Sequence, residues 1–335
     1  MTSWSQTHAR LHTQLRASDF LLPDGCSILI AVSGGQDSLC LVKLLIDLQS
    51  KWGWRLAIVH CDHRWRRDSA ANADHIRDLA AQWRLPCFIE TASTPPVSEA
   101  AARQWRYQIF ETVAQQHGFT YVTTGHTATD RAETLLYNLL RGSGLDGLQA
   151  LAWQRSLSPT ADVLVTRPLL GFTRQETGKF CQEMGLPVWE DSTNDDLTYR
   201  RNRIRQELMP YLRSHFNPQV ERTLAQTAEL LTAEVAYLEA QTDQLYADLV
   251  QRDGATWRIE RSRFRQVSLA LQRRLARRVL FEVMPEAPQF EHVEKLVKLA
   301  EMPNRSQTDP FPGGMIARVE GGALVVVGSG VVGSR

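Results

Sequence analysis

The sequence predicts an α/β fold, in which a parallel sheet with helices on both faces is followed by a smaller, mainly helical C-terminal domain. Two observations lead to this prediction. Up to residue 141, short apolar runs rich in β-branched residues alternate with segments of helical periodicity, a pattern typical of right-handed βαβ units. Beyond Asn217-Pro218 this alternation stops and a long helical pattern begins. We therefore expect two domains, residues 1–215 and residues 216–335.

The predicted elements follow one another along the chain, beginning with a helix over residues 4–19. Four strands are then expected in the first domain, at 27–32, 55–60, 86–90 and 121–126. A helix follows directly after the first strand, and further helices are expected over 68–83, 98–117 and 129–141. The second domain is expected to contain a helix over 220–249, a strand over 257–260, a helix over 269–281, and a hairpin of 315–318 with 323–327. Ligands of parallel sheets bind beyond the carboxyl ends of the strands. Ser33, His60 and His126 end three of these strands, so we expect them to face one crevice.

A glycine turn, Ser33-Gly34-Gly35-Gln36-Asp37-Ser38, links the first strand to the helix that follows it. Glycines let a phosphate approach the backbone, and the free N–H groups and dipole of a helix N-terminus favour negative charge there. Asp37 would repel a phosphate unless a divalent cation lay between them, which indicates Mg²⁺ held by Asp37 and phosphate oxygens. The turn is not a Walker A motif, because no Gly-Lys-Ser/Thr follows the glycines. The alternative is an ordinary turn with a Ser or Asp helix cap.

The turn after the fourth strand, Gly125 to Thr134, places a histidine, an arginine and two acids at the predicted crevice. We favour a functional role because of this position. The alternative is a capped helix start, in which Asp130 and Glu133 only complement the helix dipole. A metal site made from His60, Cys61 and His63 is much less favoured, because the two histidines would point to opposite faces of a strand and no matching ligands follow.

The chain carries a formal net charge of only +1, so any nucleic-acid surface must be a local patch. Two arginine-rich segments stand out, and arginine suits bidentate phosphate contacts. One has four arginines within residues 200–205, and the other has eight arginines and one acid within residues 258–278. Either an RNA contact or an ordinary solvated helix face explains such a run. Arg141-Gly142-Ser143-Gly144 is likewise either a helix stop or a phosphate-holding turn.

Several other classes of protein are disfavoured. No apolar run approaches the roughly 20 residues that span a bilayer. Residues 1–10 lack the apolar segment of a signal peptide, so we expect a cytoplasmic protein. The five cysteines are an odd number, widely spaced and without a Cys-x-x-Cys pair. This spacing argues against a disulfide framework and against a cysteine-rich metal cluster.

The glycine turn resembles the pyrophosphate-binding loop of the ATP pyrophosphatase (PP-loop) superfamily, which has a Rossmann-like fold. Such enzymes cleave ATP between the α- and β-phosphates and transfer AMP to a carbonyl oxygen. Further blocks, in matching order and spacing, resemble the tRNA(Ile)-lysidine synthetase family. In the first of these blocks, residues 60–66, Arg64 stands where a glycine or another small residue is more usual. The others are residues 99–107, 125–134, 140–148, 167–170, 190–195 and 200–210.

The resemblance implies a ligase that transfers AMP from ATP to the wobble cytidine of the isoleucine tRNA with a CAU anticodon. The ε-amine of free L-lysine would then displace AMP. Asp130 and Glu133 would bind the lysine amine or help to position metal, and Arg103 and Arg205 would stabilise phosphate charge or hold the lysine carboxylate. Asp37 would position Mg²⁺. The residues implied to hold ATP are Ser33, Gly34, Gly35, Gln36, Asp37, Ser38, His60 and His126.

Two other functions stay open at this stage. A tRNA thiolase of the same superfamily would use the same ATP chemistry, but such enzymes generally need a cysteine pair or an iron–sulfur cluster. A nucleotide-sensing RNA-binding protein without catalysis would need no acids at the crevice. Family members often have two C-terminal domains, so this chain would be a short form with one, which contacts tRNA. The sequence indicates no membrane association and no protein partner, and it leaves a homodimer open.

Overall fold

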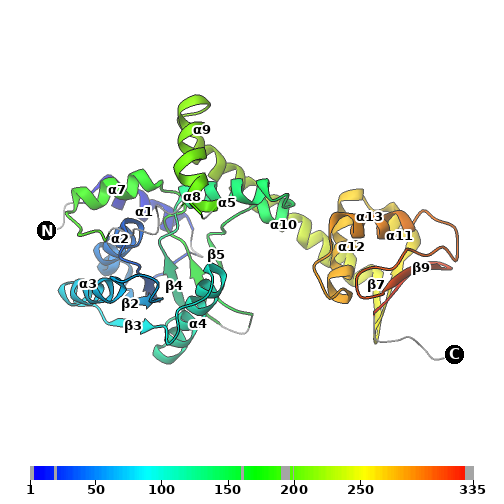
Figure 1. Cartoon of the computed structure of the whole chain (residues 1–335), viewed down its shortest axis with the longest axis horizontal. Coiled ribbons are helices and arrows are strands. Elements are labelled where there is room, and N and C mark those ends of the chain that lie inside the picture. Colours follow the sequence, from blue (N-terminus) through cyan, green and yellow to red (C-terminus); the bar gives the residue numbers. More distant parts are fainter. Residues whose placement is uncertain (1–3, 19–20, 160–161, 190–196, 199, 329–335) are drawn as a thin grey trace. The chain divides into compact units, whose positions relative to one another are not determined.

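The computed structural model describes residues 4–18, 21–159, 162–189, 197–198 and 200–328. The chain forms two compact units, residues 1–232 and residues 233–335 (Figure 1). The predicted boundary after residue 215 falls inside the first unit, because the units divide within helix α10 (Val220–Leu249). The helix itself has the predicted bounds. None of the helices that the structure describes is long and apolar enough to cross a membrane.

A six-stranded sheet forms the centre of the first unit. Its strands are β1 (Ser27–Ala31), β2 (Arg55–Asp62), β3 (Cys87–Thr91), β4 (Tyr121–Thr124), β5 (Gln154–Ser156) and β6 (Leu164–Thr166). They lie in the order β3-β2-β1-β4-β6-β5, and all neighbours are parallel except β5 and β6. The predicted parallel sheet is confirmed. The pattern of the sequence does not predict β5 and β6, which have three residues each.

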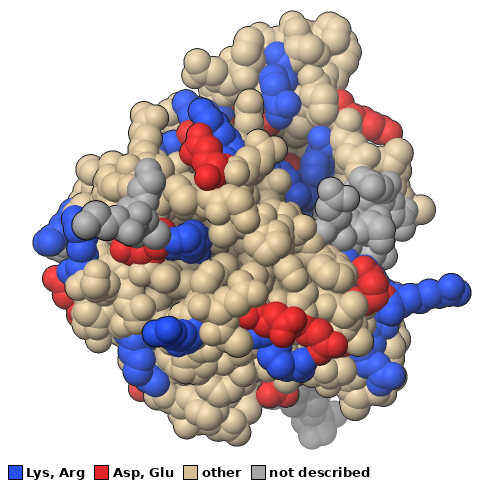
Figure 2. Space-filling model, turned by 90° about the vertical axis from the view of Figure 1, so that its left-hand side faces the viewer, with Lys and Arg blue, Asp and Glu red and all other residues tan. Residues whose placement is uncertain are grey.

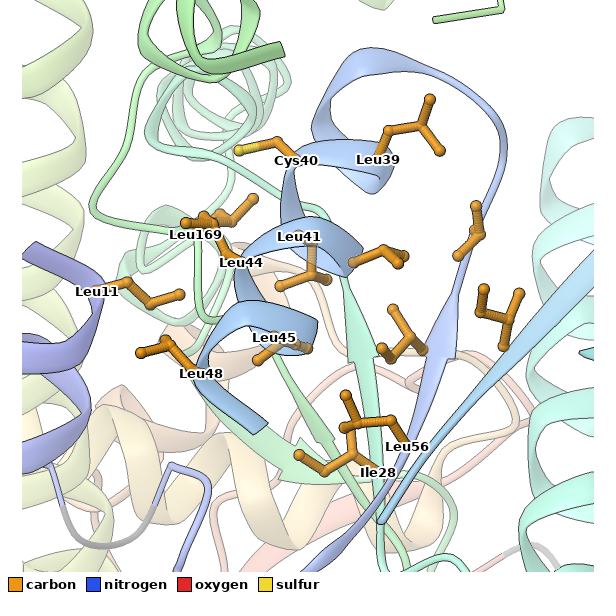
Figure 3. Packing of buried hydrophobic residues seen from close by; sticks show 14 of the residues in the cluster. Leu11, Ile28, Leu39, Cys40, Leu41, Leu44, Leu45, Leu48, Leu56 and Leu169 are labelled. Carbon is orange, nitrogen blue, oxygen red and sulfur yellow. The ribbon is translucent and has the colours of Figure 1, made fainter. Parts of the chain in front are cut away.

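Helices cover both faces of this sheet, because its central strands are apolar on both sides. On the first face lie α2 (Gln36–Trp52) and α3 (Ser69–Gln82), and α1 (Gln6–Ala17) and α7 (Arg174–Glu183) pack against α2 and contribute to the same core. The second face packs against α4 (Glu99–His117). Along β1, Ile28 and Ile30 belong to the first core and Leu29 to the second. Figure 3 shows Ile28 beside the leucines of α2. Each such buried leucine stabilises the fold by roughly 1.5–3 kcal/mol.

The remaining helices of the first unit surround the chain after β4. They are α5 (Ala128–Leu140), α6 (Leu145–Leu148), α8 (Arg200–Arg203), a π-helical turn (Ile204–Leu208) and α9 (Met209–His215). Ala132 of α5, Ile204 of the π-helical turn and Met209 of α9 share a small core. This core holds the arginine-rich segment 200–205 against α5.

The second unit combines helices with a four-stranded antiparallel sheet in the order β7-β8-β10-β9. The predicted strand and terminal hairpin are confirmed as β8, β9 and β10, and the predicted helix from residue 269 as α12. The sequence does not predict β7, α11 or α13. The elements are β7 (Val250–Asp253), β8 (Thr256–Glu260), α11 (Arg261–Gln266), α12 (Leu269–Val283), α13 (Phe290–Leu299), β9 (Ile316–Glu320) and β10 (Ala323–Val327).

Candidate active site

The glycine turn between β1 and α2 leaves the start of α2 open to an anion. Gly34 has a φ of 91°, and a Cβ there would lie 2.5 Å from Asn72 Oδ1, so only glycine fits. No side chain caps α2 at Gly35, which leaves the first N–H groups of the helix available to a ligand. The hydroxyl of Ser38 donates to Gly35 O at 2.9 Å and accepts from Ser33 N at 3.2 Å, which fixes the turn. This geometry fits a bound phosphate.

Two buried side chains from neighbouring elements support this turn. Asn72 of α3 donates from Nδ2 to Ser33 O at 3.0 Å, and its buried Oδ1 has no partner within the described residues. His60, two residues before the end of β2, donates from Nδ1 to Val32 O at 2.8 Å. Burial lowers the pKa of His60, so its imidazole is neutral at pH 7. His60 was predicted at this site, whereas Asn72 was missed because it lies in a helix without a motif.

Asp37 lies in the first turn of α2 and is held by α7. Its Oδ1 accepts from the hydroxyl of Thr177, and its Oδ2 lies 3.3 Å from Arg174 Nη1. Burial raises the pKa of Asp37 against the opposing charge of Arg174, and the negative charge of Asp130 raises it further. The side chain of Gln36 donates to Arg174 O at 2.7 Å, so it holds α7 and leaves its backbone N–H for an anion. Sequence reasoning missed both α7 residues, whose segment has only the pattern of an ordinary helix start.

The turn after β4 packs directly against the start of α2. A Cβ at Gly125 would lie 2.9 Å from the carbonyl carbon and oxygen of Asp37 and from Ser38 N, so the backbones approach as closely as glycine allows. β1 and β4 are parallel neighbours, and both turns therefore lie at one edge of the sheet. This contact brings the first turn of α5 close to Asp37, as the sequence predicts.

Helix α5 carries the two predicted acids, and both are paired with arginines of residues 200–205. Asp130 Oδ1 lies 3.0 Å from Arg201 Nη2 and 3.3 Å from Arg205 Nη2. Glu133 is fully buried and accepts from Arg205 Nε at 2.7 Å and Nη2 at 2.8 Å. Arg201 Nε lies 3.3 Å from the same carboxylate. Two acids and two arginines thus form a neutral cluster, which we call the acid–arginine cluster.

Asp130 has two roles in this cluster. Its Oδ2 accepts from Thr127 N and from the Thr127 hydroxyl, each at 2.8 Å, so the predicted alternative of a capped helix start is also correct. Burial alone would raise the pKa of Asp130, but the positive charges of Arg201 and Arg205 and the hydrogen bond from Thr127 N hold it below its usual value. The carboxylate is therefore ionised at neutral pH and can receive a cation.

His126 lies among arginines at the same edge of the sheet. Burial, followed by the positive charges of Arg167, Arg201 and Arg103, lowers the pKa of His126 to about 3, although Asp130 opposes the shift. Its imidazole is therefore neutral. Arg103 stacks on Tyr107, with Cζ 4.7 Å from the ring centroid, and donates to the phenol oxygen at 3.2 Å. The predicted Arg103 is thus adjacent to the site, together with Arg167, which sequence reasoning did not single out.

The segment after β2 is an aromatic cluster and carries no metal-ligand set. The ring of His63 lies 5.0 Å from that of Trp105 and 5.4 Å from that of Trp65, and burial lowers its pKa to about 4. Among the described residues, no group of three or more His, Cys, Asp or Glu side chains could hold a metal ion. Mg²⁺ beside Asp37 would thus need phosphate oxygens and waters as further ligands, which is its usual coordination in nucleotide sites. Arg64 has a φ of 58°, which explains why a glycine is more usual there.

Two further segments, 141–144 and 258–278, were predicted as possible phosphate contacts. Arg141-Gly142 is a helix stop, because Gly142 has a φ of 75° and its N–H donates to Leu139 O at 3.0 Å. Within 258–278, six of the eight arginines form ion pairs with acids of the same unit, and a seventh, Arg261, donates to backbone carbonyls. On the face of the first unit that Figure 2 shows, basic and acidic side chains are likewise interspersed. The acidic turn at 190–195 lies outside the described residues.

A PP-loop domain family matches residues 6–212. Relatives named tRNA(Ile)-lysidine synthase are 55% identical in Nostoc sp. and 52% identical in Synechocystis sp.. These matches cover 96% of this chain in both cases, and 97% and 98% of the respective relatives. Among solved structures, the U34-tRNA thiolase NcsA from Methanococcus maripaludis with its 4Fe–4S cluster is similar in fold, with a TM-score of 0.57 and 15% identity. That match covers 68% of this chain and 78% of the thiolase.

Proposed function

The chain belongs to the tRNA(Ile)-lysidine synthase family, and from this premise we propose that it converts the wobble cytidine of the CAU-anticodon isoleucine tRNA into lysidine with ATP, Mg²⁺ and free L-lysine. The cytosine carbonyl oxygen is a poor leaving group. Transfer of AMP from ATP to this oxygen releases pyrophosphate and makes the ring carbon electrophilic. The lysine ε-amine then bonds to that carbon and gives up a proton, and AMP leaves with the oxygen. The acid–arginine cluster beside Asp37 is the observation that carries this proposal.

The start of α2 is the proposed triphosphate site. Its uncapped N–H groups and the glycine turn suit phosphate oxygens. Mg²⁺ would be held by Asp37 and phosphate oxygens, and it would neutralise the charge that develops on the leaving pyrophosphate. Arg174, 3.3 Å from Asp37, adds a positive charge at the same place. His60 and Asn72 would keep the turn in its binding shape through their hydrogen bonds to the backbone.

The lysine amine is expected at Asp130. Glu133 is fully buried and held by two short contacts from Arg205, so this pair is fixed. Arg201 is the more exposed of the two arginines, 36% against 20%, and its contacts are single. The cluster is neutral, so an entering ammonium favours departure of one cation, and Arg201 is the cation that can leave. Arg201 would then be available to the phosphate of the adenylated cytidine, with Arg103 nearby.

The test uses unmodified isoleucine tRNA with a CAU anticodon, ATP, Mg²⁺ and radiolabelled lysine. We expect label in the tRNA together with equal amounts of AMP and pyrophosphate, and loss of all three in Asp37→Ala. Asp130→Asn should raise the KM for lysine more than that for ATP. Asp74→Asn is the matched control, because Asp74 is an exposed acid of α3 that pairs with Arg77 away from the site.

Two results would overturn the proposal. AMP formation without uptake of lysine would keep the PP-loop chemistry and require another nucleophile, as in a thiolase. Binding of tRNA without any AMP formation would leave an RNA-binding protein that senses nucleotide. A lysine KM raised equally by Asp130→Asn and Asp74→Asn would remove the assignment of the amine to Asp130.

A further inference from the structure

A cavity of about 290 Å³ lies in the first unit between the C-terminal end of α5, α8 and the π-helical turn. Its volume is at the lower end of the roughly 300–1,000 Å³ typical of small-molecule sites, so it suits a group of about one nucleotide. Isolated π-helical turns are rare and frequently occur at functional sites. The residues of its lining that matter here are Tyr137, Leu140, Arg141, Arg200, Arg203 and Glu207.

The described residues provide no acid that pairs with the arginines of this cavity. Within the described part of the protein, Arg141, Arg200 and Arg203 form no ion pair with an acid; Arg141 donates only to the Tyr137 hydroxyl, at 3.4 Å. Arg201 and Arg205, which share the segment with two of them, both pair with acids of α5. The lining therefore contributes three positive charges against the one negative charge of Glu207. Such a surplus favours an anionic ligand.

The cavity also offers a surface on which a planar group can stack. The guanidinium of Arg141 lies over the Tyr137 ring, with Cζ 5.3 Å from the centroid. Leu140 beside them is 70% exposed and adds apolar surface that a planar group can cover. Single-stranded RNA is recognised by this combination, in which bases stack on aromatic rings or arginine planes and cations follow the phosphates.

The cavity adjoins the acid–arginine cluster. Tyr137 and Leu140 follow Glu133 by four and seven residues, so all three lie on one face of α5, at distances of about 6 and 10 Å along its axis. Arg200 and Arg203 flank Arg201 on the opposite segment. We propose that this cavity seats one nucleotide of the RNA that neighbours the modified cytidine. Arg200 and Arg203 hold its phosphate, and the Tyr137–Arg141 pair receives its base. The identity of this RNA rests on the proposed function.

The test measures binding of unmodified tRNA to the full chain and the KM for tRNA, lysine and ATP. Arg203→Ala should weaken tRNA binding several-fold and reduce the slope of log affinity against log salt by about one. Tyr137→Leu should weaken binding about tenfold by removing the stacking surface, and Tyr137→Phe should restore it. The KM values for ATP and lysine should not change. Arg77→Ala, at an exposed arginine of α3, is the control and should match the wild type.

A tRNA with an abasic nucleotide on either side of the cytidine identifies the occupant. One of the two abasic tRNAs should bind about tenfold more weakly to the wild type, and this loss should disappear in Tyr137→Leu, because both changes remove the same contact. Additive losses, or equal salt slopes for Arg203→Ala and Arg77→Ala, would overturn the proposal. If these patterns are found without lysine incorporation, the cavity assignment stands and the proposed function fails. If lysine is incorporated but these binding patterns are absent, the proposed function stands and the cavity assignment fails.

Discussion

Replacement of Gly125 by alanine tests whether the turn after β4 positions the reactive groups. The added Cβ would lie 2.9 Å from three backbone atoms of Asp37 and Ser38, whereas ordinary Cβ contacts begin at 3.4 Å, so one backbone must move by about half an ångström. Backbone atoms cannot rotate out of the way as a side chain does. We expect the free energy of unfolding to fall by about 1–3 kcal/mol. For a unit of this size, the melting temperature falls by roughly 2–4 °C per kcal/mol.

The same shift should reduce activity, because it separates Asp37 from the groups at the start of α5. A misplacement of about 1 Å costs on the order of 100-fold in rate, so a shift of about half an ångström should lower kcat/KM about tenfold. The assay is lysine-dependent release of AMP, with a thermal melt of the same samples. Gly144→Ala is the control, because a Cβ there meets nothing within 4 Å and its φ is −69°. If Gly125→Ala melts and turns over like Gly144→Ala, the close approach does not constrain the site.

Three further changes test single interactions. Arg205→Met should lower the free energy of unfolding by about 3 kcal/mol, because it leaves the buried Glu133 without its main partner. Arg265→Met is the control, because Arg265 forms an exposed ion pair with Glu301. Equal urea midpoints for the two variants would contradict this reasoning. Asp37→Asn should abolish activity and raise the melting temperature at pH 7, because burial raises the pKa of Asp37 and its ionisation therefore costs stability. The gain in melting temperature should decline as the pH falls through the folded-state pKa of Asp37. It should be absent below the pKa of an unfolded aspartate. A gain that is independent of pH would exclude this cause. Arg64→Gly should stabilise the chain by about 0.5–1 kcal/mol in denaturant titration, because only glycine adopts a φ of 58° without strain; an unchanged midpoint would show that contacts of the Arg64 side chain offset the strain of its backbone.

The sheet could be predicted because its signals are local. β1 and β2 are continuous apolar runs, as expected for strands buried on both faces, and a turn signal follows each. β5 and β6 have three residues each, too few for any period to show. In the second unit, β8 pairs with β10, more than 60 residues further along the chain, and pairing at that distance leaves no local pattern.

The acids of the site could be predicted from residue type and strand order, but their partners could not. Arg174 and Thr177 reach Asp37 from a helix about 140 residues later in the chain. Arg131 illustrates the opposite case. It stands between Asp130 and Glu133 in sequence, yet it is 2% exposed and pairs with an acid of α10. Helical spacing predicts that Arg131 lies on a different face from Asp130 and Glu133, because consecutive residues are about 100° apart around a helix, whereas residues three apart share a face.

The arginines show why the total positive charge of a sequence segment ranks RNA surfaces poorly. The 258–278 segment is the most basic in the chain, yet most of its arginines already have an acid as partner, in part from α10 and α13. A phosphate arriving there must replace a carboxylate, and such an exchange releases few counterions from the RNA per contact made. Arg141, Arg200 and Arg203 lie in segments with fewer arginines in total, and the described residues provide no acid that pairs with them. In a chain with 38 basic and 37 acidic residues, a surplus of charge arises from spatial pairing and cannot be counted from composition. Of the two arginine-rich segments, the one that lines the cavity beside α5 should therefore contribute more to the salt dependence of tRNA binding.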